Sequence, residues 1–236
     1  MPSGEPGGSP KTSFELLYKI SRIISSDRYL EEILLLIVGM TAELMNSKIC
    51  SLMILDEQKQ ELVIKATQSL SENYRAKGPI KVGESISGRA VAEKKTITVA
   101  DVTKEPGYKF PDIARKEGLK SLVSVPLMIK NRIIGVLNCY TESEHDFSEE
   151  EIKLLAGVAN QAAVAIENTR LLTDKIAAAE ELETRKRLDR AKGILMKRNK
   201  ISEDEAHKML QKWSMEKRAP LKNIVEAVIL SQEMIN

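Results

Sequence analysis

Cysteine, histidine and long apolar runs are all scarce in this chain of 236 residues. The two cysteines, Cys50 and Cys139, exclude a framework of several disulfides, and together with the lack of an export signal they predict a reducing, cytoplasmic location. The two histidines, His145 and His207, are too few for a multi-histidine metal or haem site. No apolar stretch reaches the roughly 20 residues that cross a bilayer, so we expect no membrane span.

The net charge of +2 hides an uneven distribution. Residues 183–236 hold 13 Lys and Arg against 8 Asp and Glu, a balance of +5, whereas residues 1–182 hold 23 against 26, a balance of −3. A small basic segment behind a slightly acidic body favours a polyanionic partner for that segment. A solvated helix surface would have the same composition, so charge alone does not identify the partner.

The pattern of apolar residues predicts helices at both ends of the chain and strands between them. Residues 1–13, rich in glycine, proline and serine, are interpreted as a flexible tail without a signal peptide. Helical spacing follows from Phe14 to about Met45, with Ser26 or Asp27 as the cap between two helices. Two β-hairpins, a short helix and a further strand are then predicted, at Ile49–Leu55 with Leu62–Thr67, Arg89–Glu93, Thr96–Val99, and Ser121–Ile129 with Arg132–Tyr140. The fold class expected from this order is α+β.

Several short motifs in residues 14–172 together resemble a GAF domain, a small-molecule sensor module. They are Gly83-Glu84-Ser85-Ile86-Ser87-Gly88, Ser124-Val125-Pro126-Leu127, Ile134-Gly135-Val136-Leu137, Phe147-Ser148, Leu154-Leu155 and Gln161-Ala162-Ala163-Val164-Ala165-Ile166-Glu167-Asn168. The resemblance implies an antiparallel sheet with helices on one face and a ligand pocket on the other. It implies a small-molecule effector without naming it, because the same fold serves many ligands.

The residues themselves argue against several known kinds of GAF ligand and activity. The Asn-Lys-Phe-Asp-Glu signature of cyclic-nucleotide binders is missing from the sequence. Cys50 and Cys139 lie in predicted strands, where thiols are usually inert packing residues, so neither bilin attachment nor redox catalysis is favoured. His145 stands in a charged loop and is interpreted as a solvated residue. We therefore expect no catalytic residue, no bound metal and no identifiable cofactor.

From Ser148 onward the chain reads as one long helix with an apolar seam. Seam positions alternate by three and four residues, the spacing of a two-helix coiled coil, at Ile152, Leu155, Ala159, Ala162, Ile166, Thr169, Leu172 and Ile176. We expect a homodimer through the helix around residues 152–190, although the alanines could equally pack on the GAF sheet over the first turns. Residues 173–181, rich in alanine and charge, are interpreted as a helical linker, and residues 182–236 as a separate output domain.

A basic stripe is predicted on the helix that opens the output domain. At 100° per residue, one side collects Lys186, Arg190, Gly193, Lys197 and Lys200, opposite Leu188 and Leu195. Arg187 and Arg198 fall on a flank of this stripe. A glycine within a helix costs about 1 kcal/mol relative to alanine, which indicates that RNA or a packed helix approaches the backbone there.

Two more short helices are predicted to complete the output domain. Ser202 and Glu205 form the pattern of a capping box, which starts the first of them, and Pro220 can occupy the first turn of the second. Apolar positions at helical spacing are expected to pack inward, namely Ala206, Met209, Leu210, Trp213 and Met215, then Leu221, Ile224, Val225, Val228 and Ile229. A unit this small is expected to depend on dimerisation through the preceding helix.

This three-helix unit resembles an ANTAR domain, an RNA-binding module of transcription antiterminators. The resemblance covers about Leu182–Ile235 and rests on Ala191-Lys192-Gly193-Ile194-Leu195-Met196, Lys197-Arg198, Ser202-Glu203-Asp204-Glu205-Ala206, Leu210, Ser214 and Leu221. The sequence departs from the family pattern at His207, Arg218 and Val225. The resemblance implies a homodimer that binds paired stem-loops with six-nucleotide loops in nascent mRNA and so prevents a terminator hairpin.

Eight residues are predicted to contact RNA. Sequence-specific RNA recognition favours exposed loops, and a basic helical surface supplies phosphate contacts to them. Four residues are expected at phosphates, Lys186, Arg190, Lys197 and Arg198, and four follow from the ANTAR motif as loop contacts, Lys192, Gly193, Ser214 and Arg218. Trp213 could stack on a base but is favoured as a core residue. The alternatives are a DNA-binding regulator and a sensor that binds only protein.

Overall fold

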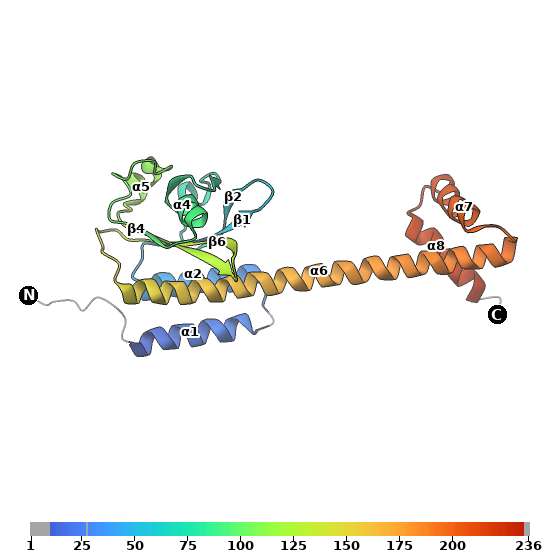
Figure 1. Cartoon of the computed structure of the whole chain (residues 1–236), viewed down its shortest axis with the longest axis horizontal. Coiled ribbons are helices and arrows are strands. Elements are labelled where there is room, and N and C mark those ends of the chain that lie inside the picture. The colour runs from blue at the N-terminus through green and yellow to red at the C-terminus, as the bar shows by residue number, and fades with distance from the viewer. Residues whose placement is uncertain (1–9, 27, 234–236) are drawn as a thin grey trace, which may run out of the picture. The chain divides into compact units, whose positions relative to one another are not determined.

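The chain divides into two compact units, residues 1–169 and residues 170–236 (Figure 1). The computed structural model describes residues 10–26 and 28–233. Residues 1–9 of the expected tail lie outside this description, and helix α1 (Pro10–Ile24) begins within the range assigned to the tail. Within the described residues, no helix is both long and apolar enough to cross a membrane.

The two helices predicted between Phe14 and Met45 are confirmed as α1 and α2 (Leu30–Leu44). The prediction that Ser26 caps α2 was wrong. The residue before α2 is Tyr29, and its side chain makes no capping hydrogen bond. The hydroxyl of Ser26 instead donates to the carbonyl oxygen of Ile23, at the end of α1. Asp27 lies outside the described residues.

The first unit is built on a six-stranded antiparallel sheet of order β3-β2-β1-β6-β5-β4. The strands are β1 (Ile49–Asp56), β2 (Glu61–Thr67), β3 (Ile80–Lys81), β4 (Ile97–Val99), β5 (Leu122–Ile129) and β6 (Arg132–Tyr140). Both predicted hairpins are therefore confirmed, to within one residue at each end. A Cβ on Gly135 would lie 2.1 Å from the carbonyl oxygen of Met53, so only glycine lets β6 pair this closely with β1.

Helices cover both faces of this sheet (Figure 1). Helices α1, α2 and the first turns of α6 (Glu149–Asn199) pack on one face, around buried residues such as Ile37, Leu52 and Leu137. Three shorter helices lie over the other face, namely α3 (Glu72–Arg75), α4 (Ser85–Glu93) and α5 (Pro111–Glu117). The predicted α+β class with a GAF-like antiparallel sheet is thus confirmed.

Three short elements of the first unit were missed by the sequence prediction. Helices α3 and α5 and strand β3 span two to seven residues, too short to show an apolar period. The short helix predicted from Arg89 begins four residues earlier, at Ser85. Gly88 lies within that helix, and a Cβ there would lie 2.2 Å from the carbonyl oxygen of Lys81, so only glycine allows this close approach.

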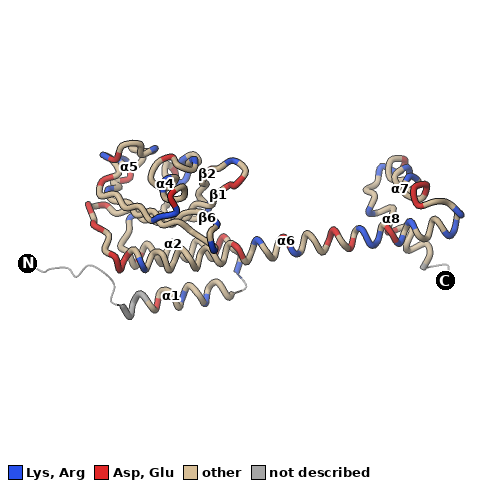
Figure 2. Tube along the Cα trace, in the orientation of Figure 1, with Lys and Arg blue, Asp and Glu red and all other residues tan. Residues whose placement is uncertain are grey.

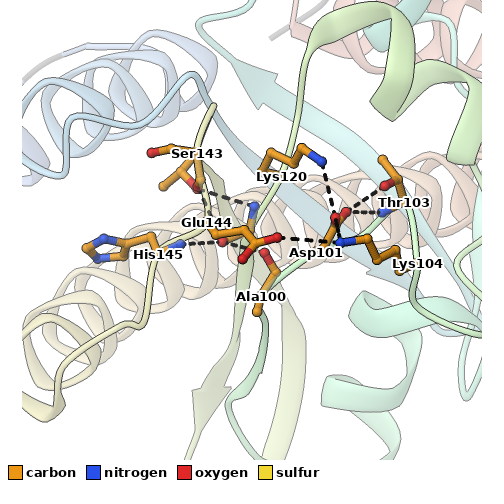
Figure 3. Close-up of polar contacts among 10 residues, drawn as sticks. Ala100, Asp101, Thr103, Lys104, Lys120, Ser143, Glu144 and His145 are labelled. Atoms are coloured by element: carbon orange, nitrogen blue, oxygen red, sulfur yellow. Dashed lines mark hydrogen bonds and ion pairs between the residues drawn. The ribbon is translucent and has the colours of Figure 1, made fainter.

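A polar network ties together the loops at one end of the sheet (Figure 3). The buried carboxylate of Asp101 accepts hydrogen bonds from the backbone N–H and hydroxyl of Thr103, at 2.9 and 2.6 Å, and from Lys120 Nζ at 3.1 Å. Hydrogen bonds from Thr103 and Lys104 hold the pKa of Asp101 well below its usual range. The hydroxyl of Ser121 donates to the carbonyl oxygen of Ala100 at 2.7 Å, which fixes the loop after β4 against β5.

The second unit is a three-helix arrangement. The later part of α6 packs with α7 (Glu203–Glu216) and α8 (Leu221–Glu233) around one apolar cluster, made of Ala191, Leu195, Ala206, Leu210, Ile224, Val225, Val228 and Ile229. The predicted capping box is present, because Ser202 Oγ accepts from the backbone of Glu205 while the Glu205 side chain accepts from the backbone of Ser202. Pro220 precedes α8 by one residue. Met215 was wrongly predicted to face inward, since 72% of its surface is exposed.

Candidate RNA-binding interface

The basic stripe occupies the exposed side of α6 in the second unit. Lys186, Arg190, Lys197 and Lys200 are exposed, whereas Ala191 and Leu195 on the opposite side are buried. The predicted projection of the helix therefore agrees with its packing. Lys and Arg gather along the last turns of α6 (Figure 2).

Most cations of this stripe are not neutralised within the described part of the chain. There, Lys186, Lys197 and Lys200 of the stripe have no ion pair with a carboxylate, and neither has Arg198 on its flank. Arg187 differs, because it pairs with Glu183 at 3.3 Å and with Glu226 of α8 at 3.4 Å. The unpaired cations leave a positive surface that is available to an anion.

Lys192 is held against the start of α7 by two ion pairs. Its ammonium group pairs with Asp189 at 2.7 Å and with Glu203 at the start of α7 at 2.6 Å, and only 13% of the side chain is exposed. Hydrogen bonds to Asp189 and Glu203 raise the pKa of Lys192. The geometry gives Lys192 a role in joining α6 to α7, and its contact with an RNA loop stays a prediction.

Ser214 and Arg218 lie together at the turn between α7 and α8. Ser214 Oγ donates to the carbonyl oxygen of Ala219 at 2.7 Å, so this hydroxyl fastens the turn. Arg218 is exposed and adopts a left-handed backbone with φ of 48°. Lys217 is exposed beside it and was not among the predicted contacts. Of the two motif residues at this turn, Ser214 stabilises the backbone and Arg218 presents an exposed positive charge.

Gly193 has open space where a side chain would stand. A Cβ built on it meets no atom of the described chain within 4 Å, and the backbone φ is not in the left-handed region. Packing within the chain therefore does not require glycine at this position. Of the two approaching groups that the sequence suggested, a packed helix of the same chain is excluded among the described residues.

The predicted dimer seam divides into a buried and an exposed part. Four seam residues, Leu155, Ala159, Ala162 and Ile166, are buried in the first unit against the sheet and its helices. Of the two expectations for these turns, a seam with a second chain and packing on the GAF sheet, the structure shows packing on the sheet. Further along α6, more than half of the surface of each of four large apolar side chains is exposed, at Leu171, Leu172, Ile176 and Leu182.

An apolar groove of about 590 Å³ adjoins this exposed part of α6. Ile176, Ala179 and Leu188 line it from α6, and Leu221 and Val225 line it from α8. Because the groove is formed by helices that are remote in sequence, the apolar spacing of α6 alone could not reveal it.

The first unit offers no exposed thiol. Cys50 and Cys139 are cross-strand neighbours in β1 and β6, with both side chains buried and the Sγ atoms 3.5 Å apart. Burial raises the pKa of the Cys50 thiol well above its usual value, which disfavours the reactive thiolate. Both cysteines lie in strands, as predicted. Among the described residues, no group of three or more His, Cys, Asp or Glu could hold a metal ion.

Comparison with known proteins gives related domains for both units. A solved GAF domain, from a phosphoenolpyruvate-protein phosphotransferase of Coxiella burnetii, superposes with a TM-score of 0.65 at 26% identity, covering 71% of this chain and 99% of that one. The methyl sulfide methyltransferase-associated sensor of Methanosarcina acetivorans is 29% identical over 166 residues, which are 67% of this chain and 17% of that protein.

One relative of the second unit has the name of a transcriptional regulator. The transcriptional regulatory protein PdtaR of Mycobacterium tuberculosis is 36% identical over 63 residues, which are 27% of this chain and 31% of PdtaR. The chain therefore spans less than a third of the length of either curated relative. Residues 27–167 match the family described as GAF domain and residues 177–229 the family described as ANTAR domain. The chain belongs to the GAF family and carries an ANTAR domain behind its GAF domain, as a GAF–ANTAR protein.

Proposed function

We propose that this protein is an effector-controlled transcription antiterminator that binds RNA through its ANTAR domain. A dimer binds two stem-loops with six-nucleotide loops in a nascent transcript, and this binding prevents a terminator hairpin from forming. The GAF domain senses a small molecule and has no enzymatic role. Because the target is nascent RNA, the protein acts in the cytoplasm, where bacterial transcripts are made.

The observation that carries this proposal is the positive surface of α6. Lys186, Lys197 and Arg198 present charge that no carboxylate of the described residues neutralises. Phosphate contacts of this kind dominate the affinity of proteins for nucleic acids. The name of PdtaR, a transcriptional regulatory protein, supports a role in transcription for the ANTAR domain. The name of the Methanosarcina relative supports a sensing role for the GAF domain.

A dimer would bring two such surfaces together. At 100° per residue, the exposed apolar residues Leu172 and Ile176 and the basic residues Lys186 and Lys197 lie on one side of the same helix. Parallel pairing of two copies through the apolar part therefore places their basic parts next to each other. Two linked sites on one RNA bind more tightly than either alone, because the second contact becomes intramolecular.

The test is a gel shift with the double variant Lys186→Glu and Lys197→Glu. Its probes are an RNA with two six-nucleotide stem-loops, the same RNA with one stem-loop, and a duplex DNA of equal length. We expect the wild type to prefer the two-loop RNA. The variant should lose affinity by on the order of 100-fold and lower the salt slope by roughly 2.8, because two phosphate contacts are removed from each of the two chains of the dimer.

The matched control carries the same charge reversal on the GAF domain, as Lys19→Glu and Lys65→Glu, two exposed lysines. This control should bind RNA as the wild type does, and circular dichroism should show both variants folded. An unchanged RNA affinity of the Lys186 and Lys197 variant would overturn the assignment. Preference for duplex DNA would favour a DNA-binding regulator, and no retention of any nucleic acid at physiological salt would favour a protein-binding sensor.

A further inference from the structure

A row of buried polar side chains crosses the middle of the GAF sheet. Ser51 of β1 and Ser124 of β5 are the register partners of Asn138 in β6, so the three side chains share one face of the sheet. All three are fully buried. Apolar clusters lie on this face as well, one containing Ile49 and Tyr140 and the other Met53 and Val136. A polar row within an apolar layer is costly unless every group is hydrogen-bonded.

The amide of Asn138 is satisfied at one end only. Its Oδ1 accepts hydrogen bonds from Ser124 Oγ at 2.6 Å and from Ser87 Oγ of α4 at 2.9 Å. Its Nδ2 has no partner among the described residues, although the side chain is fully buried. Leaving a buried donor unpaired costs about 1–3 kcal/mol, and native proteins retain such groups where a ligand or another function uses them.

An aromatic cluster adjoins this row. Tyr74 is linked to Ser51, because their hydroxyl oxygens are 2.7 Å apart. The ring of Tyr74 packs edge-on against that of Tyr140, with centroids 5.9 Å apart, and the hydroxyl of Tyr108 donates to that of Tyr140 at 3.3 Å. The polar row and the aromatic rings therefore form one buried layer between the sheet and α3, α4 and α5.

Lys77 brings a positive charge to this surface. Its Nζ lies 4.0 Å from the ring centroid of Tyr74, 5.7 Å from that of Tyr140 and 5.9 Å from that of Phe110. The side chain is partly buried, and burial lowers the pKa of Lys77 to about 7. Within the described part of the chain, no carboxylate pairs with it.

The neighbouring Lys109 shows the usual arrangement. Its Nζ is also near the ring of Phe110, at 5.7 Å, but it pairs with Glu84 at 2.7 Å and donates to the carbonyl oxygen of Pro79 at 2.8 Å. Buried charges in proteins are normally paired in this way. Lys77 is therefore a partly buried cation without a carboxylate partner among the described residues, and it lies near Tyr140, which is two residues from Asn138 on the same face of β6.

We propose that the surface formed by Lys77, Tyr74, Phe110, Tyr108, Tyr140 and Asn138 binds a small organic anion with a carboxylate group, and that this anion is the effector. Lys77 pairs with the carboxylate, the aromatic rings contact the apolar part, and Asn138 Nδ2 donates to a further acceptor of the ligand. The regulatory role of this anion rests on the proposed antiterminator function, whereas its binding to the GAF domain does not.

The test measures thermal unfolding of the full chain with acetate, benzoate and succinate, each against its neutral amide, at equal ionic strength. A carboxylate present at ten times its Kd should raise the midpoint by about 3–6 °C, and its amide should not. Calorimetry then gives the Kd. Lys77→Met should abolish the shift, Lys77→Arg should restore part of it, and the surface control Lys65→Met should retain it.

Each of three results would overturn the proposal. These are no stabilisation of the wild type by any carboxylate, equal shifts with carboxylates and amides, and a Lys77→Met variant that responds as the wild type does. RNA binding in the absence of these anions is measured separately and should be unchanged in Lys77→Met. Failure of the anion site would therefore leave the RNA result standing, and failure of RNA binding would leave the anion site standing.

Discussion

At Gly193, alanine would stabilise the helix, whereas the proposed RNA contact favours glycine. A Cβ there meets nothing within 4 Å, so alanine fits without strain. Glycine nevertheless costs the helix about 1 kcal/mol relative to alanine. No packing contact of the described residues requires glycine at this position. The proposal that RNA approaches the backbone at this position gives the glycine a reason.

We therefore expect Gly193→Ala to raise the free energy of unfolding by about 1 kcal/mol and to weaken RNA binding by about tenfold. Urea unfolding and a gel shift measure the two effects. The control is Gly39→Ala in α2, a helical glycine that also has nothing within 4 Å of its Cβ. It should stabilise the protein equally and leave RNA binding unchanged. A Gly193→Ala variant that binds RNA as tightly as the wild type would contradict a close approach.

Single residues show where prediction from the sequence reached its limit. The exposure of Lys186, Lys197 and Arg198 followed from helical periodicity, because it depends on one helix only. The pairing of Lys192 with Glu203 joins two helices and depends on their packing angle, which the sequence does not show. The role of Lys77 was missed for a similar reason. A single lysine in a loop has no periodic pattern, and two of its three aromatic neighbours, Phe110 and Tyr140, are remote from it in the sequence.

At the scale of elements, α6 shows why its apolar spacing was ambiguous. The same alternation of three and four residues serves packing on a sheet and packing on a second helix. Its first turns bury Leu155 and Ile166 in the GAF domain, whereas Leu172 and Ile176 are exposed. Long periodic helices and hairpins were predicted correctly because their patterns extend over many residues, and the short elements α3, β3 and α5 were not.

The exposed part of α6 predicts where a dimer can form. Replacing Leu172 and Ile176 with glutamate places four like charges in a two-helix seam, so we expect a monomer in light scattering and weaker binding of the two-loop RNA. The control replaces two exposed apolar residues of the GAF domain, as Val63→Glu and Leu70→Glu. It should leave the oligomeric state unchanged. Persistence of a dimer in the Leu172 and Ile176 variant would exclude this seam.

At the scale of the whole molecule, one helix belongs to both domains. The boundary between the two units falls at Thr169 and Arg170, inside α6. If the effector controls RNA binding, the effector and the RNA must each favour one of two conformations of the protein. Each ligand then changes the affinity for the other by the same factor. The continuous helical backbone makes the rotational phase of α6 the simplest quantity that such a change can transmit.

Insertions between Thr169 and Arg170 test this phase directly. Seven helical residues add 700°, which is 20° short of two full turns, whereas two residues add 200°. We expect both insertions to retain RNA binding without effector, since the seam and the basic stripe move together. The carboxylate that stabilises the GAF domain should change the RNA affinity of the seven-residue variant as in the wild type, and should not change that of the two-residue variant. An equal response from both insertions would show that the phase of α6 does not carry the signal.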